Sequence, residues 1–143
     1  WVMGGVAPHA GLFSTANDIA IFGQTMSNKG EWMGTRYFKD YNIEMFTGRQ
    51  NMPEGSDRAI GWDTPSQGGK SSAGDYFSNS SYGHLGFTGT SFWIDPENDI
   101  VVVLLTNRVH PTRKNKGIYG IRRAFHTEVM KEILNQSDTM GLN

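Results

Sequence analysis

The chain has 143 residues, of which 37% are apolar, and a formal net charge of -1, values typical of one folded domain. Its 13 basic residues balance 14 acidic ones, so no nucleic-acid partner is expected, and the absence of cysteine excludes disulfides and thiolate catalysis. The longest apolar run, Ile100 to Leu105, is too short to span a membrane. No metal site and no cofactor is expected, because the four histidines lack the spacing typical of zinc ligands.

Two helices are predicted in the first third of the chain. Apolar residues recur at helical spacing over Ala16 to Ser27, and Thr15 with Asp18 three residues later resembles the capping box that starts a helix. A mixed apolar pattern over Tyr37 to Phe46 predicts a second, shorter helix.

The middle of the chain is predicted to be rich in loops. Arg58 to Trp62 has the pattern of a short strand, whereas Asp63 to Ser81 is rich in serine and glycine. A loop of that length is uncommon in a compact domain and is usually functional or mobile.

The last part of the chain predicts a β-hairpin and then a helix. Phe87 to Asp95 and Ile100 to Thr106 have strand patterns, joined by a turn with Pro96 at its second position. Because the second strand is apolar on both faces, we expect it to be central and covered on both sides. A helix is predicted over Lys116 to Leu134, with an apolar stripe formed by Ile118, Ile121, Phe125, Val129 and Ile133. The predicted fold class is α+β, an antiparallel sheet with helices packed on it.

The strongest functional signal is the segment Ser81 to Ser91, which leads into the predicted hairpin and contains His84-Leu85-Gly86. It resembles the third motif of the serine β-lactamase and penicillin-binding-protein superfamily, K-T-G on a strand that lines the active site. The form H-x-G is typical of many hydrolases related to the class C β-lactamases. Ala10 to Thr15 with Asp18-Ile19-Ala20 is similar to another segment of that family, and Leu104 to Arg108 is similar to its last central strand. The segments follow the family's order, so the resemblance covers nearly the whole chain.

The resemblance implies an incomplete β-lactamase-like fold. The chain begins at Trp1 rather than at methionine, and we expect residues 1–143 to be the C-terminal part of a single β-lactamase-like domain. The family's nucleophile motif S-x-x-K and its Y-x-N motif, which both precede H-x-G in the family, do not occur in this sequence. We therefore expect the chain alone to be inactive, and to self-associate through uncovered sheet surface.

The motif suggests a role for each of its residues. A small residue at Gly86 lets a substrate lie along the strand, and the backbone N–H of Phe87 is expected to form half of an oxyanion hole. By the resemblance, His84 stands where the family's lysine binds a substrate carboxylate or relays protons, although His84 could also merely end a loop. The expected substrate-binding segment is completed by Leu85, Thr88 and Gly89.

The resemblance implies acyl transfer through a serine ester to water, with an ester, a β-lactam or a D-amino-acid peptide as substrate. Similar segments also follow a family-3 glycoside hydrolase domain of the β-N-acetylhexosaminidase type in bacterial proteins. That context implies cell-wall or glycan processing and a periplasmic or cell-envelope location, with a small-molecule, peptide or glycan substrate as partner. Two alternatives stay open: a non-catalytic β-lactamase-like scaffold or ligand-binding domain, which histidine in place of lysine also fits, and a carbohydrate-binding module.

Overall fold

The computed structural model describes residues 4, 7 and 11–140. Its elements in chain order are α1 Ala16–Ser27, β1 Glu31–Trp32, β2 Thr35–Arg36, α2 Asp40–Thr47, β3 Tyr82–Leu85, β4 Ser91–Asp95, β5 Ile100–Leu104 and α3 Ile118–Met140. The predicted start of α1 is confirmed, because Thr15 Oγ1 accepts the Asp18 N–H at 3.2 Å and donates to the Asp18 carboxylate at 2.8 Å.

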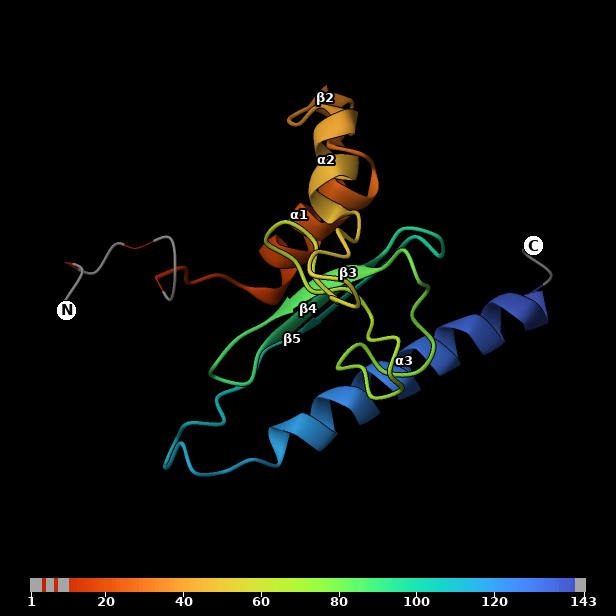
Figure 1. Ribbon diagram of the computed structural model, residues 1–143. Helices are drawn as coiled ribbons and strands as arrows, with labels where there is room; N and C mark the ends of the chain where they lie inside the picture. Colours follow the sequence, from red (N-terminus) through yellow and green to blue (C-terminus); the bar gives the residue numbers. More distant parts are fainter. Residues whose placement is uncertain (1–3, 5–6, 8–10, 141–143) are drawn as a thin grey trace.

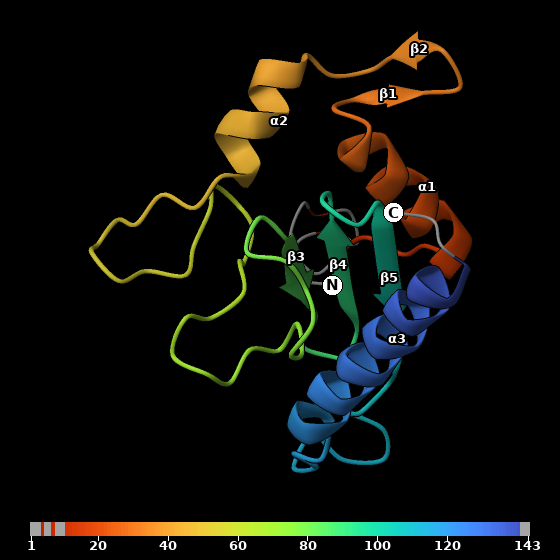
Figure 2. The same ribbon diagram turned by 90° about the vertical axis from the view of Figure 1, so that its right-hand side faces the viewer.

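The strands β3, β4 and β5 form an antiparallel sheet in that order, and β1 with β2 forms a separate hairpin. Figure 1 shows the larger sheet between α1 on one side and α3 on the other, and in Figure 2 α3 crosses the sheet obliquely. Alternating side chains of β4 reach the two layers. The Phe92 ring lies 6.2 Å from Phe22 of α1, whereas Ser91 forms a hydrogen bond with His126 of α3. The predicted α+β class with an antiparallel sheet is confirmed.

A hydrophobic core fills the space between α1 and the sheet. Its buried members are Met26, Ile43, Tyr82 and Ile94, and the half-buried residues packed against them are Trp62, Phe92 and Val101. The helix approaches the sheet closely at Gly23, where a Cβ atom would lie only 2.6 Å from Cγ1 of Val101. A larger residue at Gly23 would force α1 away from the sheet.

The face of α3 that meets the sheet differs from the predicted stripe. The buried positions are four residues apart, namely Ile118, Arg122, His126 and Met130. Two members of the predicted stripe are exposed instead, Ile121 by 57% and Ile133 by 36%. Polar side chains occupy the buried face because Arg122 and His126 form hydrogen bonds with groups of the β3–β4 hairpin.

The predicted elements around the hairpins need three corrections. Residues 58–62 form no named strand, because the chain turns tightly there, with Ala59 N–H donating to the Trp62 carbonyl and Gly61 at a φ of +80°. The predicted strand over residues 87–95 begins only at Ser91, because the residues before it form a turn. A separate strand, β3, precedes that turn, and its sequence Tyr-Gly-His-Leu lacks the apolar alternation that predicts a strand.

The strand β5 lies at the edge of the described sheet, where a central position was predicted. Its apolar residues are instead covered from the two faces, as the packing of Val101 against Gly23 illustrates on the α1 side. Within residues 11–140, no helix combines the length and the apolar character needed to cross a membrane.

Candidate active site

The H-x-G segment lies at the end of β3 and in the turn that follows. His84 and Leu85 are the last residues of β3, and the chain then turns back into β4. Gly86 N–H donates to the Thr90 carbonyl at 2.8 Å, and Gly89 N–H donates to the Gly86 carbonyl at 3.0 Å. With Gly89 at a φ of +106°, this is a three-residue hairpin loop that ends in a residue of positive φ. The six residues predicted from the motif are contiguous in this strand end and turn.

Close packing limits the space for a side chain at both glycines of this strand end. A Cβ atom at Gly86 would lie 1.9 Å from Thr90 Oγ1. A Cβ atom at Gly83 would lie 2.3 Å from the Phe92 carbonyl oxygen and would also meet the ring of Trp93. Gly86 therefore has a structural reason to be small, in addition to its expected role of admitting a substrate.

His84 is exposed and lies opposite Phe92 of β4. Its Nδ1 donates to the Leu85 carbonyl at 2.9 Å, so in the neutral ring the lone pair is on Nε2. On the same face of the sheet, Tyr82 and Phe92 pack against Trp62, with ring centroids 5.3 and 6.1 Å away. An exposed imidazole beside an aromatic surface can accept a proton, donate one, or pair with a carboxylate.

The outer edge of β3 is partly occupied. Gly83 exchanges two backbone hydrogen bonds with Asp63, Asp63 N–H to the Gly83 carbonyl at 2.8 Å and Gly83 N–H to the Asp63 carbonyl at 2.9 Å. Because peptide groups alternate in direction along a strand, Leu85 presents its peptide groups on the same edge, beyond this bridge. An extended substrate can therefore add to the edge at Leu85 and the following turn.

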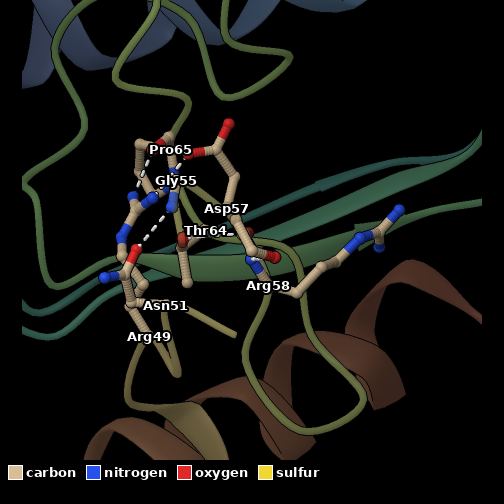
Figure 3. Close-up of polar contacts among 8 residues, drawn as sticks. Arg49, Asn51, Gly55, Asp57, Arg58, Thr64 and Pro65 are labelled. Atoms are coloured by element: carbon tan, nitrogen blue, oxygen red, sulfur yellow. Dashed lines mark hydrogen bonds and ion pairs between the residues drawn. The ribbon is translucent and has the colours of Figure 1, made fainter. Parts of the chain in front are cut away.

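A hairpin of residues 57–64 provides that bridge, and Arg49 anchors it. Figure 3 shows Arg49 directed at Asp57 and Pro65, whereas Arg58 extends away from this cluster. Arg49 Nη1 lies 2.5 Å from Asp57 Oδ1, and Nη2 lies 2.5 Å from the Pro65 carbonyl oxygen. The hydrogen bond from Arg49 holds the pKa of Asp57 below its ordinary value. The loop beside β3 is thus fixed by a charged hydrogen-bond network.

Two arginines bind the carbonyl groups of the β3–β4 turn. The backbone N–H of Arg108 donates to the Thr88 carbonyl at 2.7 Å, and its Nε donates to the Phe87 carbonyl at 2.8 Å. The Arg108 guanidinium also lies 4.5 Å from the centroid of the Phe87 ring. Arg122 of α3 binds the remaining carbonyls of the turn, those of Gly86, Gly89 and Thr90.

The turn leaves backbone donors available, and the N–H of Phe87 is one of them. Among the described residues, the backbone N–H of Phe87 has no hydrogen-bond acceptor, although the Phe87 carbonyl is bound by Arg108. Its side chain is 66% exposed, so this end of the hairpin is open to solvent. A backbone donor held in a rigid turn can stabilise negative charge on a substrate oxygen.

Known proteins resemble this chain over most of its length. The family described as Beta-lactamase matches residues 1–125, which include β3, the turn and the start of α3. The chain belongs to the beta-lactamase family. Relatives from Salmonella agona (strain SL483) and Salmonella gallinarum (strain 287/91 / NCTC 13346) carry the name D-alanyl-D-alanine carboxypeptidase. They are 40% identical over 109 residues and 41% identical over 112 residues, and each match covers 76% of this chain and 25% of the relative. The chain therefore spans about a quarter of the length of these relatives.

The beta-lactamase segment also has a pocket of about 310 Å³ away from the motif. The pocket lies between the C-terminal end of α1, α2 and the start of β3, and its lining includes Met26, Ile43, Arg49 and Tyr82. None of residues 84–89 lines it. The candidate site is thus an open strand end and turn. In the part of the chain that the structure describes, no three histidine, aspartate or glutamate side chains gather in a way that could hold a metal ion.

The arginines of the turn were not found from the sequence. Arg108 is the last residue of the segment that resembles the family's last central strand, but nothing in that pattern indicates a contact with Phe87. Arg122 belongs to no motif, and its only signal is its position four residues after Ile118 on a predicted helix. A polar residue at a position expected to face the sheet is the kind of exception that marks a specific contact.

Proposed function

We propose that this chain supplies one wall of the active site of a serine hydrolase, which transfers an acyl group through a serine ester to water. Membership of the beta-lactamase family supports the reaction class. The name of the Salmonella relatives supports a peptide that ends in D-amino acids as the substrate, in bacterial cell-wall metabolism. In this role the chain binds the substrate and stabilises negative charge, and the serine comes from a part of the protein outside these residues.

The observation that carries the proposal is the available N–H of Phe87 in a turn whose carbonyls are bound by arginines. The serine hydroxyl gives its proton to a base, its oxygen bonds to the substrate carbonyl carbon, and the electron pair of the carbonyl π bond moves to the carbonyl oxygen. The Phe87 N–H donates to that oxygen and stabilises its charge. The edge of β3 at Leu85 holds the substrate in an extended form beside the turn.

His84 completes the wall at the other end of the motif. The Nε2 atom of its neutral ring can take a proton, and the protonated ring can bind the terminal carboxylate of a peptide. The carboxylate role needs the charged ring, whereas a base role needs the neutral ring.

Turnover by the full-length protein tests this function. A D-alanyl-D-alanine peptide, a chromogenic ester and a chromogenic β-lactam are compared as substrates, with the chain of residues 1–143 as a second sample. We expect turnover by the full-length protein alone. His84→Ala should lower kcat/KM by about ten- to ten-thousand-fold, the range of an acid, base or binding group.

The matched control is His110→Ala, which removes an exposed histidine outside the β3–β4 hairpin. An unchanged rate in His84→Ala would remove His84 from the site. A folded full-length protein that turns over none of the three substrates would instead support a non-catalytic scaffold or ligand-binding domain.

The proposal extends to location and context. Cell-wall peptides are processed outside the cytoplasm, so we place the full-length protein in the cell envelope or periplasm. A preceding glycoside hydrolase domain of the β-N-acetylhexosaminidase type would join peptide and glycan processing in one protein. The sequence that precedes this chain in its gene tests both statements directly, through an export signal and a glycosidase domain.

A further inference from the structure

Arg122 is a buried cation in the interface between α3 and the β3–β4 turn. Its exposed fraction is 4%, and its guanidinium donates only to backbone carbonyls among the hydrogen bonds of the described residues. Nη2 lies 2.5 Å from the Gly86 oxygen and 2.8 Å from the Thr90 oxygen, and Nε lies 3.0 Å from the Gly89 oxygen. The guanidinium thus donates hydrogen bonds to three carbonyl groups of one turn.

Burying this charge is costly for the fold. None of the ion pairs found within residues 11–140 gives Arg122 a carboxylate partner. A buried arginine without a counter-ion is stabilised only by the dipoles of its acceptors, which offset the loss of its hydration in part. Its neighbour on the same helix face, His126, carries no compensating negative charge. The arrangement therefore points to a purpose other than stability.

The hydrogen bond from Arg122 to the Gly86 carbonyl acts on the peptide group that contains the candidate oxyanion donor, the Phe87 N–H. The Gly86 carbonyl and the Phe87 N–H belong to the same peptide group, so a charge-assisted hydrogen bond to the oxygen draws electron density from the nitrogen. Hydrogen bonds that share a polarisable group strengthen one another, by roughly 10–30% per bond in condensed phase. The contact also fixes the plane of that peptide, and with it the direction of the N–H.

We infer that Arg122 is the positioning residue of the oxyanion hole: it orients and polarises the Gly86–Phe87 peptide so that the Phe87 N–H meets the developing negative charge. This role rests on the proposed function. Arg108 has a different task, because its Nε binds the Phe87 carbonyl and thus the next peptide group along the chain. The two arginines act on successive peptides of the turn.

The kinetic test uses the full-length protein with Arg122→Gln and Arg122→Lys, on the substrate that the wild type turns over best. An interaction that strengthens only in the transition state should appear in kcat. We expect Arg122→Gln to lower kcat by about 10–100-fold and to change KM by less than about two-fold, because the donor itself is retained. Lysine keeps the charge but lacks the planar fork of guanidinium donors that fits these three carbonyls, so Arg122→Lys should recover part of the loss.

Arg123→Gln is the matched control, because it removes the neighbouring arginine, whose ion pair with Asp75 lies at the surface. We expect its kcat to equal that of the wild type. The melting temperature of every variant is measured alongside. If Arg122→Gln fails to fold, Arg122→Lys carries the comparison. Folded variants of Arg122 with wild-type kcat would overturn the inference.

A second readout does not depend on catalysis. The dipeptide Gly-Phe occurs once in this chain, at Gly86-Phe87, so labelling with [1-¹³C]glycine and [¹⁵N]phenylalanine selects that peptide by NMR. Phe87→Tyr assigns the signal in the full-length protein by deleting it. We expect Arg122→Gln to move the amide proton to lower frequency, because the N–H is less polarised, and Arg123→Gln to leave it in place. An unmoved signal in a folded Arg122→Gln protein overturns the inference whether or not the protein is active. A wild type without turnover overturns the proposed function, separately from this signal.

Discussion

Ser91 Oγ and His126 Nε2 lie 2.8 Å apart in a buried hydrogen bond that joins β4 to α3. Their exposed fractions are 2% and 0%, and His126 Nδ1 has no hydrogen-bond partner among the residues that the structure describes. Burial, and then the positive charge of Arg122, lower the pKa of His126 to about 4. His126 is therefore neutral in the folded protein at neutral pH. A second proton would place a charge in an apolar interface beside an existing cation.

This contact predicts that the free energy of unfolding falls in acid at pH values well above those at which carboxylates titrate. A histidine in the unfolded chain has a pKa of about 6.5, whereas that of His126 in the folded chain is about 4. Between pH 6.5 and about 4, the unfolded state therefore binds a proton that the folded state does not bind. Stability should therefore fall as the pH drops through this window, by roughly 3 kcal/mol in total. Urea unfolding at pH 7.0, 6.0 and 5.0 measures the slope.

His126→Gln provides the test of that assignment. Glutamine does not titrate, so the variant should lose most of the pH dependence between pH 7.0 and 5.0, whatever its stability at pH 7.0. His110→Gln removes an exposed histidine and should keep the wild-type slope. Equal slopes in all three proteins would assign the acid sensitivity to other groups.

The features predicted correctly from the sequence depend on near neighbours in the chain. The start of α1 follows from Thr15 and Asp18, which are three residues apart and bind each other. The turn between β4 and β5 follows from Asp95 and Pro96, and the Asp95 carboxylate accepts the N–H groups of the residues that follow. Such local contacts leave a recognisable pattern in the sequence.

The buried face of α3 could not be predicted in the same way. A helical period fits the predicted stripe through Ile121 and the observed face through Arg122 equally well. The buried face is determined by hydrogen-bond partners that are distant in the sequence. Arg122 binds the Gly89 carbonyl, 33 residues away, and His126 binds Ser91, 35 residues away. In the candidate site too, some features depend on near neighbours in the sequence and others on distant residues. Its motif was found by resemblance, but the arginines that hold its turn come from distant parts of the chain.

Asp95 should be the most important carboxylate for stability. It is fully buried and accepts hydrogen bonds from Ser78 N at 2.8 Å, Ser78 Oγ at 2.7 Å and Asn98 Nδ2 at 2.8 Å. Burial alone would raise the pKa of Asp95, but the hydrogen bonds from Ser78 and Asn98 together lower it. We expect Asp95→Ala to lower the free energy of unfolding by about 2–4 kcal/mol, because it leaves buried donors unpaired.

Glu97→Gln is the control for Asp95. Glu97 is exposed in the same turn, and its amide replacement can still accept the Ser80 hydroxyl, so the free energy of unfolding should change by less than about 0.5 kcal/mol. Urea denaturation at pH 7 compares the variants. Similar losses in both would mean that the turn, rather than the buried carboxylate, is the sensitive feature.

The two glycines of the strand end should differ in their tolerance of a methyl group. In Gly83→Ala the new Cβ meets the Phe92 carbonyl oxygen and the buried ring of Trp93, neither of which can move freely, so we expect a loss of about 3 kcal/mol. In Gly86→Ala it meets the Thr90 hydroxyl, which can rotate away, so about 1 kcal/mol is expected. Urea denaturation measures both variants. The double variant Gly86→Ala with Thr90→Ala should recover most of the smaller loss, and no recovery would contradict the assigned clash.

The outer edge of β5, which pairs with no further strand of the described residues, should drive self-association of the isolated chain. Gly83 directs its N–H and carbonyl outward to Asp63, so its partner Trp93 directs its own toward β5 and bonds with Val102. The neighbours of Val102, Val101 and Val103, therefore direct their N–H and carbonyl groups away from the sheet. Exposed apolar side chains, including Phe13 at 93% and Met33 at 87%, add to this tendency. We expect sedimentation velocity to show concentration-dependent oligomers.

Proline substitutions at Val102 and Val103 of β5 distinguish association through the strand edge from association through exposed apolar side chains. Val103→Pro removes an outward N–H and keeps the ladder to β4, so it should shift the chain toward monomer with little loss of secondary structure. Val102→Pro removes an N–H that faces β4, opposite Trp93, and should destabilise the sheet instead. A wild-type chain that stays monomeric at all concentrations would refute the prediction. Oligomers that persist in a folded Val103→Pro chain would assign the association to the apolar surface.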